Sequence, residues 1–407
     1  MAPIPLLHEN LPSIAVLPLH NFGRDPADDY FADGIVEDVI LSLARLRELL
    51  VISRGSTLKY RGPDIDPRHV GRDLGVRYVL GGSVSKAAQR LRVSAQLYDA
   101  ETGSSLWTKT MEFGPGDLFA VQDQVVRRVV PRIAPHVRAA ELRGALRKRP
   151  ESFTAYDWML RALHIINSLD VNTFLQAREF LNRAMTEDSH FAMPVAWAAR
   201  WHCLRIGQGW SPAPDEDARR ATELATRAID LDRQNALGLA TYGHLKSFLF
   251  HDYDVAMVYF DRALTACPNS SLAWILSSAT LSYVGRGAEA VERAGQGLRL
   301  SPHDQSIFYY YAFLSIAHYS NGNYPEAIRW GRMAARENPV YTTTYRILAA
   351  SLAATDRLEE ARDSAAAVLN LEPDFRLGEY ERTRQPFQSL QIKTRYLQQL
   401  KKAGLPN

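Results

Sequence analysis

Residues 253–302 read YDVAMVYFDRALTACPNSSLAWILSSATLSYVGRGAEAVERAGQGLRLSP. In this stretch small residues recur at fixed places, a proline follows them, and the same spacing returns 34 residues later. Four successive units carry the pattern: Ala256, Phe260, Ala263 and Pro268; Ala290, Ala294, Gly297 and Pro302; Ala327, Gly331, Ala334 and Pro339; and Ala361, Ala365, Val368 and Pro373. Three extra residues separate the second unit from the third. A constant period of this length predicts helix pairs stacked in a row, so that each unit packs only on its neighbours.

The spacing is that of the tetratricopeptide repeat (TPR), in which small side chains let the second helix nest against the first. The aromatic residue expected early in the first helix appears in successive units as Trp274, Tyr311 and Tyr345. Two weaker units precede these, with Ala221, Ala225 and Ala228 in one and Ala177, Leu181 and Ala184 in the other. We therefore expect about six helix pairs over residues 151–376, with a proline ending the second helix of each of the four strong units and Arg233 in its place in one weaker unit. Residues 377–407 are expected to form a capping helix and a frayed tail.

The first helix of each pair faces the concave side of such an array, and the frame predicts which of its positions are exposed there. These are Tyr242, Leu245, Phe248, Ile275, Tyr283, Tyr309, Phe313, Ile316, Tyr319 and Arg346. The lining is apolar and aromatic, unlike the Lys, Arg and Asn lining of a repeat that clamps carboxylates. It predicts a hydrophobic groove for a helix or an extended apolar segment of a partner protein. The alternative is that these side chains pack against neighbouring repeats or against the N-terminal domain.

Residues 1–150 have a different pattern, in the order β-α-β-α-β-β-β-α. Strands are expected over residues 13–19, 49–54, 76–85, 91–99 and 105–113, and helices over 28–46, 66–74 and 117–149. Apolar and polar residues alternate over 91–99, which is typical of a sheet with one solvated face. Gly81 and Gly82 lie within a strand, where a bulge or a close backbone approach is expected rather than a phosphate loop. The fold class is therefore an α+β domain with a mixed sheet and helices, followed by an all-α TPR superhelical array.

The last helix of the N-terminal domain is basic. Its arginines include Arg127, Arg128, Arg132 and Arg138, which together predict a patch that binds anions, while the alternative is an ordinary solvated helix face. Residues 1–150 carry 21 Lys+Arg against 17 Asp+Glu, a net charge of only +4. This is weak support for binding dominated by phosphate contacts, so we do not expect a nucleic acid partner.

Composition excludes several classes of protein. The 407 residues carry 48 Lys+Arg against 45 Asp+Glu and are 46% hydrophobic, which excludes a disordered chain, a disulfide-rich module and a collagen. Cys203 and Cys267 lie in apolar helical contexts and are expected to be small buried residues. Prolines interrupt the apolar N-terminus and no run approaches the ~18 apolar residues of a membrane span, so we expect a soluble cytoplasmic protein. No catalytic or zinc-binding motif is present, and we expect no catalytic residue, metal or cofactor.

Several segments of the chain carry a resemblance to a known family. They are SIAVLPLHNF (13–22), DYFADGIVEDVILSLARL (29–46), LLVISRGSTLKYRG (49–62), VGRDLGVRYVLGGSVSKAAQRLRVSAQLYDAETGSSLWTKTMEF (70–113) and DLFAVQDQVVRRVV (117–130). They closely resemble the regulatory region of bacterial TPR-containing class III adenylate cyclases, which also occurs in winged-helix transcriptional activators with TPR tails. The first part is similar to the N-terminal domain of the periplasmic protein TolB. The resemblance covers residues 13–376.

In those relatives the region follows an effector domain, either a cyclase or a DNA-binding winged helix. Only twelve residues precede the first expected strand here, so no residue of this sequence is expected to correspond to the metal-binding aspartates of a cyclase. The resemblance therefore implies a non-catalytic signalling scaffold that binds protein partners through the TPR array and controls an effector, a cyclase or a winged-helix protein, in trans. The alternatives are an accessory subunit or truncated cyclase in cyclic-nucleotide synthesis, and a component of a transcriptional regulator. Association of the chain with itself is left open.

Overall fold

The computed structural model describes residues 11–23, 26–62, 65–87, 90–114, 118–146, 153–301 and 304–407. The chain divides into two compact units, Met1–Leu160 and Arg161–Asn407, which are described separately. The sequence placed this boundary at residue 150, whereas helix α5 (Ala155–Ser168) crosses the boundary at residue 160.

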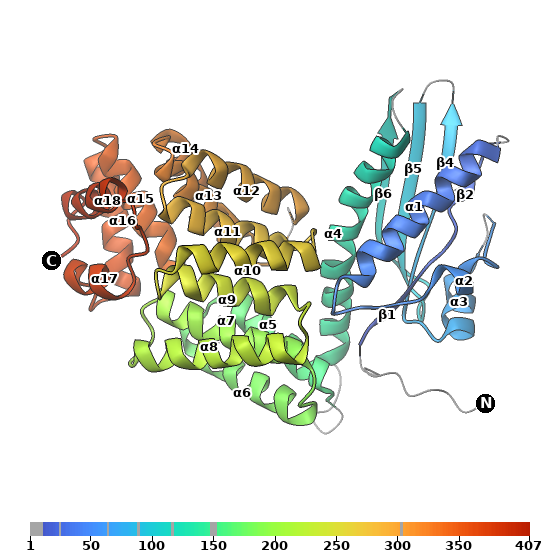
Figure 1. Ribbon diagram of the computed structural model, residues 1–407, viewed down its shortest axis with the longest axis horizontal. Helices are drawn as coiled ribbons and strands as arrows, with labels where there is room; N and C mark the ends of the chain where they lie inside the picture. Colours follow the sequence, from blue (N-terminus) through green and yellow to red (C-terminus); the bar gives the residue numbers. More distant parts are fainter. Residues whose placement is uncertain are drawn as a thin grey trace. The chain divides into compact units, whose positions relative to one another are not determined.

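The first unit contains a mixed sheet, as expected. Its strands among the described residues are β1 (Ser13–Val16), β2 (His20–Asn21), β3 (Leu50–Val51), β4 (Tyr78–Ala87), β5 (Arg90–Asp99) and β6 (Ser105–Phe113). They lie in the order β3-β1-β4-β5-β6, with β2 also paired to β4 (Figure 1). β1 runs parallel to β3 and β4, whereas β4, β5 and β6 are antiparallel neighbours. The strand expected over residues 49–54 is shorter because the short helix α2 (Arg54–Thr57) begins where it would continue.

Helices pack on both faces of this sheet. On one face, α1 (Pro26–Ala44) and α4 (Leu118–Ala145) bury apolar residues against Ile14 and Val16. On the other face, α3 (Pro67–Leu74) covers Ala15 and Leu17, because successive side chains of a strand point to opposite sides. Both faces of the sheet are therefore buried near β1. β6 has a largely exposed face, which agrees with the solvated face predicted from the alternating apolar and polar residues of β5.

Gly82 occupies a point where two backbones approach closely, as expected from the sequence. A Cβ atom at this position would lie 2.0 Å from the carbonyl oxygen of Ser94 on β5 and 2.9 Å from Leu19 Cδ2. The same atom at Gly81 would meet nothing nearer than Tyr98 Cε2 at 4.0 Å. Of these two glycines, Gly82 is therefore the one that requires the absence of a side chain.

We expect Gly82→Ala to destabilise the first unit by roughly 1–3 kcal/mol, because β4 and β5 must separate to admit the methyl group. Hydrogen exchange of the β4–β5 amides measures this locally, and the exchange should be faster in the variant. Gly81→Ala is the matched control and should leave the exchange nearly unchanged. Equal exchange in the two variants would contradict the close approach.

The second unit is built of helix pairs that follow one another along the chain (Figure 1). Its helices are α6 (Val171–Glu187), α7 (Ala192–Gly207), α8 (Pro214–Leu231), α9 (Ala236–Phe248), α10 (Tyr253–Ala266), α11 (Ser271–Tyr283), α12 (Gly287–Leu300), α13 (Ile307–Ser320), α14 (Tyr324–Glu337), α15 (Thr342–Ala354), α16 (Leu358–Leu371), α17 (Leu377–Thr383) and α18 (Leu390–Lys402). Within the described residues 192–371, five pairs pack face to face, from α7–α8 to α15–α16, and α6 packs on α7. The chain therefore contains an array of TPR-type helical repeats.

The two helices of a pair differ in how much of their surface is buried. The second helices bury one narrow face, formed by the small residues of the 34-residue frame; in α14 these are Ala327, Gly331 and Ala334. The first helices are buried nearly all round; in α13 most residues from Ile307 to Ser320 are inaccessible. A helix that is apolar on every side requires partners on every side. The first helices α7, α9, α11, α13 and α15 therefore form an inner layer and the second helices an outer one.

The inner layer is enclosed because early and late parts of the array touch. Asn338 Nδ2 donates to the Ser168 carbonyl at 3.2 Å, and Gln208 Nε2 donates to the Val340 carbonyl at 3.2 Å. Asn167 Nδ2 likewise donates to Gln305 Oε1 at 3.2 Å. These contacts join residues 167–208 to residues 305–340, so the row of helix pairs closes on itself.

The C-terminal region differs from the expected capping helix and frayed tail. It contains two helices, α17 and α18, joined by residues 384–389, and α18 packs on α15. Leu405 is buried, and the Leu377 amide donates to the Pro406 carbonyl at 2.9 Å. The tail is thus tied back onto α17 by a backbone hydrogen bond, which corrects the prediction that it frays.

Candidate functional site

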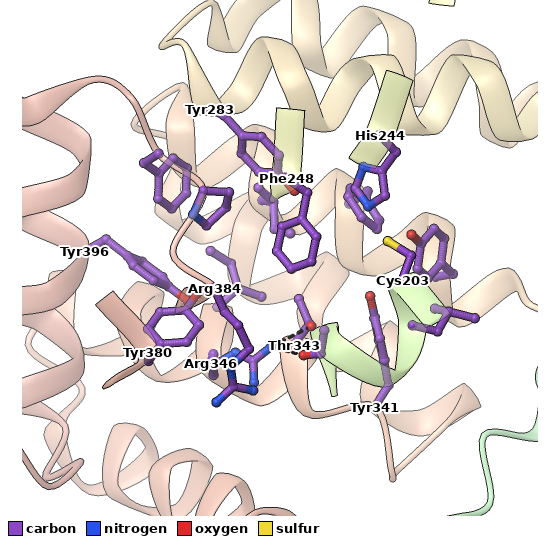
Figure 2. Close-up of a pocket in the computed structure, with 18 residues that line it drawn as sticks. Cys203, His244, Phe248, Tyr283, Tyr341, Thr343, Arg346, Tyr380, Arg384 and Tyr396 are labelled. Atoms are coloured by element: carbon purple, nitrogen blue, oxygen red, sulfur yellow. Dashed lines mark hydrogen bonds between the residues drawn. The ribbon is translucent and has the colours of Figure 1, made fainter. Parts of the chain in front are cut away.

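A cavity of about 60 Å³ lies among the first helices of the array and the C-terminal region (Figure 2). Eight of its eighteen lining residues are Phe or Tyr: Phe248, Tyr283, Tyr309, Phe313, Tyr341, Tyr380, Phe387 and Tyr396. Polar and charged groups are fewer and include His244, Thr343, Arg346 and Arg384. Since the wall is drawn from α7, α9, α11, α13, α15, α17 and α18, no single repeat forms the site.

The ten positions predicted to line an exposed groove are mostly buried. Eight of them are inaccessible to solvent, and only Tyr242 and Phe248 are partly exposed. Six line the cavity: Phe248, Tyr283, Tyr309, Phe313, Ile316 and Arg346. The other four, Tyr242, Leu245, Ile275 and Tyr319, lie outside its wall. The expectation of an open, exposed groove is therefore corrected, while a binding role for the six cavity residues stays a prediction.

Part of the concave surface is covered by the chain itself, through residues 384–389, here called the closing loop. The Gln388 amide donates to the Tyr283 carbonyl at 2.8 Å, and the Tyr253 hydroxyl donates to the Pro386 carbonyl at 2.8 Å. Phe387 is buried between Tyr283 and Tyr396, with ring centroids 5.9 Å and 5.2 Å away. The closing loop thus takes the place of the extended apolar segment for which the groove was predicted.

Two arginines beside the cavity share one carboxylate. Arg384 makes a bidentate pair with Glu372, and Arg346 Nη1 lies 3.5 Å from Glu372 Oε2. Arg346 Nη2 also donates to Thr343 Oγ1 at 2.8 Å and to the Gly207 carbonyl at 3.1 Å. Figure 2 shows Arg346 and Arg384 together on one side of the cavity, with Phe248 pointing toward it from α9. This group fixes the closing loop and α15 to the end of α7.

Gly209 lies directly over this group of charges. Its φ of +76° belongs to the left-handed region that favours glycine, and a Cβ there would lie 2.5 Å from Glu372 Oε1. The turn after α7 therefore depends on glycine both for its backbone and for the space occupied by the ion pair.

Two further groups of the cavity wall are uncharged at neutral pH. Burial lowers the pKa of His244 to about 3, and the nearby Arg200 charge adds to the effect. Burial raises the pKa of the Cys203 thiol to about 12, although Arg200 opposes the shift. Cys203 and Cys267 are both buried and neither is part of a disulfide, as the sequence predicted. The arginines and Glu372 therefore carry the charge at this site.

We expect the free energy of unfolding to fall on acidification because of His244. In the unfolded chain the His244 side chain binds a proton with the usual pKa of about 6.5, whereas burial lowers the pKa to about 3 in the folded protein. The contribution of neutral His244 to the free energy of unfolding is thus complete above pH 6.5 and is lost as the pH falls. The loss between pH 7 and pH 5 is about 2 kcal/mol. Urea unfolding at both pH values measures the loss, which His244→Asn should reduce. The exposed His190→Asn should not change it, and an equal loss in wild type and His244→Asn would contradict this origin.

The frame positions of the second helices are buried where the structure describes them. Ala256, Phe260, Ala263, Ala290, Ala327 and Ala361 have no accessible surface. Pro268, Pro339 and Pro373 lie just beyond the ends of α10, α14 and α16, and Pro302 lies outside the described residues. The early aromatics Trp274, Tyr311 and Tyr345 are half-buried. Trp274 donates its indole N–H to the Pro268 carbonyl at 2.9 Å, which ties the first helix to the preceding turn.

The basic helix α4 does not present four free cations. Arg138 pairs with Glu48 at 2.7 Å and Arg127 with Asp123 at 3.1 Å. The Arg128 guanidinium lies 5.3 Å from the centroid of the Phe113 ring, and burial lowers the pKa of Arg132. Anion binding by this helix stays a prediction, with less free charge to support it than the sequence suggested.

Sequence reasoning missed several residues of the cavity, among them Glu372, Tyr341, Tyr380, Arg384 and Tyr396. A signal for some of them was present. Three aromatics, Tyr380, Phe387 and Tyr396, occur in the C-terminal region where the repeat frame has ended, and a cap that faces water has little use for them. The pairing of Glu372 with Arg346 and Arg384 has no local sequence signal.

No described group of three or more His, Cys, Asp or Glu side chains is arranged to hold a metal ion. Among the described helices, none combines the length and hydropathy needed to cross a bilayer.

Comparison with known proteins gives one curated relative and several solved structures. No protein-family model matches the chain. The chain is 38% identical over 227 residues to a protein of Rhizobium meliloti (strain 1021) named putative adenylate cyclase 3, a match that covers 56% of this chain and 39% of that protein. The chain therefore matches well under half the length of this relative.

Among solved structures, a chain of the APC/C hetero-tetramer Cut9–Hcn1 has a TM-score of 0.44 and 14% identity, covering 71% of this chain and 49% of that chain. TolB from Acinetobacter baumannii has a TM-score of 0.25 and 21% identity, covering 32% of this chain and 29% of that chain. The closed row of helix pairs and the sequence match together describe a protein with TPR-type repeats that has a distant relative named as an adenylate cyclase.

Proposed function

We propose that this chain is a non-catalytic signalling scaffold that binds and controls the catalytic domain of a class III adenylate cyclase in trans. The observation that carries the proposal is the 38% identity over 227 residues to part of a protein named putative adenylate cyclase 3. In this proposal the first unit is a TolB-like domain and the helical array supplies the surface for protein partners.

The partner engages the concave face by replacing the closing loop. Among the described contacts, the loop is held by the hydrogen bonds of Gln388 and Pro386, by the Phe387 ring and by the Arg384–Glu372 pair. An extended partner segment with an apolar side chain in the place of Phe387 would form the same backbone contacts with Tyr283.

The experiment mixes the purified chain with the purified portion of the Rhizobium meliloti protein that lies outside the matched 227 residues. We expect a complex by isothermal titration calorimetry and a changed rate of cyclic AMP formation from ATP. Phe387→Ala should strengthen the complex because the loop is released more easily, whereas Leu175→Ala, on the exposed face of α6, should leave it unchanged. Absence of both a complex and a rate change would overturn the proposal.

The name of the same relative also favours a second candidate, in which the chain itself takes part in cyclic-nucleotide synthesis. The same experiment tests this candidate when the purified chain is assayed alone. Cyclic AMP formed by the chain alone would support the second candidate, and turnover only when the relative's portion is present supports the scaffold.

A further inference from the structure

Buried arginine side chains near the cavity outnumber the carboxylates that pair with them. Arg346 and Arg384 share the single carboxylate of Glu372. Arg200 lies behind the cavity wall, is buried, and takes part in no ion pair within the described part of the chain; its guanidinium lies 4.7 Å from the centroid of the Tyr309 ring. Arg346 and Arg384 thus share one carboxylate, Arg200 is a third buried guanidinium next to Tyr309 of the wall, and a buried charge without a counterion is costly.

Arg346 has hydrogen-bond donors that the described residues do not use. The side chain is only 4% exposed. Its Nε and Nη1 atoms have no hydrogen-bond partner among the described residues, and the 3.5 Å from Nη1 to Glu372 is long for a hydrogen bond. A buried donor left unsatisfied destabilises a protein, more so when it is charged. An anionic acceptor in the cavity would satisfy these atoms and balance the charge.

The rest of the wall sets the chemical character of the ligand. Phe248, Tyr309 and Phe313 present aromatic surface to the cavity, which favours an apolar group rather than a hydrated inorganic ion. The neutral states of His244 and Cys203 leave Arg346 and Arg384 as the positive side. The ligand therefore needs one anionic end and one apolar end.

The volume sets the size of the ligand. A cavity of about 60 Å³ by this measure holds roughly four to six water-sized groups, since one water needs about 10–15 Å³. This corresponds to a short aliphatic acid and excludes a nucleotide or a peptide.

We propose that the cavity is a binding site for a small organic monocarboxylate, whose carboxylate pairs with Arg346 and whose short apolar chain packs against Phe248 and Phe313. The closing loop forms part of the cavity wall through Arg384, Pro386 and Phe387, and the proposal does not depend on which effector the chain controls. It would make the array a sensor of a short-chain acid.

Calorimetric titration of the full chain with sodium butyrate tests the site. We expect saturable binding with a Kd on the order of 1 mM, as is usual for about six non-hydrogen atoms. Butyramide has the same size without the charge and should not bind, and sodium chloride at matched ionic strength controls for salt. Hexanoate should bind more weakly because its chain exceeds the cavity. Equal binding of butyrate and butyramide would show that the site does not recognise the carboxylate, and no binding of either would show that water alone fills the cavity; each result would overturn the proposal.

Variants locate the bound acid. Arg346→Met should weaken butyrate binding by about 10- to 100-fold through loss of the charged hydrogen bonds. The control Arg293→Met removes a partly buried arginine on α12, outside the cavity, and should bind as wild type does. If Arg346→Met does not fold, Phe248→Trp serves instead, because the larger ring fills the cavity and should abolish binding. Butyrate binding retained in a folded Arg346→Met or Phe248→Trp protein would overturn the assignment.

Discussion

Replacing Glu372 by Gln is expected to destabilise the array by about 3–5 kcal/mol. The carboxylate is 11% exposed and is shared by Arg346 and Arg384, which are themselves buried. The substitution keeps the shape of the side chain but leaves two guanidinium groups without a counterion. The midpoint of urea unfolding measures the loss.

Glu360→Gln is the matched control for this prediction. Glu360 lies on α16, the helix that Glu372 directly follows, and pairs with Arg357 and Arg332 at the surface. Exposed ion pairs contribute little, so its unfolding midpoint should stay close to that of wild type. Similar midpoints for the two variants would show that Glu372 does not balance the buried arginines.

Trp201→Ala is the second substitution with a large expected effect. Trp201 on α7 is 2% exposed, stacks on Phe174 of α6 with ring centroids 5.2 Å apart, and donates its indole N–H to the Phe174 carbonyl at 2.9 Å. Truncation leaves a cavity and removes the hydrogen bond from the indole to α6, at a cost of about 3–5 kcal/mol. Scanning calorimetry should show a melting temperature lower by on the order of 10 °C.

The half-buried Trp274 provides the comparison for Trp201. Its indole N–H also donates to a backbone carbonyl, that of Pro268 at 2.9 Å, but much of its ring is accessible. Trp274→Ala should therefore lower the melting temperature by clearly less. Equal losses would indicate that α6 does not depend on the Trp201 contact for its packing.

The second helices of the array were predictable because their constraint is local. A helix that nests through one narrow face needs small residues at fixed spacing, and Ala327, Gly331 and Ala334 show that spacing directly. Residue patterns likewise located α3, where Asp66 caps the first turn and Gly75 ends the helix at a φ of +65°. Each feature depends on neighbours within a few positions of the chain.

The closed concave face was not predictable in the same way. The all-round apolar sequence of α13 indicates burial on every side but does not say which segment covers it. The cover is formed by Phe387 and Tyr396, distant in sequence from the residues they meet. The pair between Arg346 on α15 and Glu372 at the end of α16 joins residues far apart in the chain and likewise has no local signal. The residues of an apolar groove and those of a buried core have the same composition, so the 34-residue repeat frame alone could not distinguish the two.

Closure of the array also changes how it should come apart. An open row of repeats frays from its ends, because the terminal repeats have one neighbour each. Here Ser168 and Gln208 near the start are hydrogen-bonded to Asn338 and Val340 of a later pair, and the C-terminal Pro406 is bonded to Leu377. Neither end is then a free starting point for stepwise unzipping. The second unit should behave as one cooperative body, whose repeats are lost together rather than in turn.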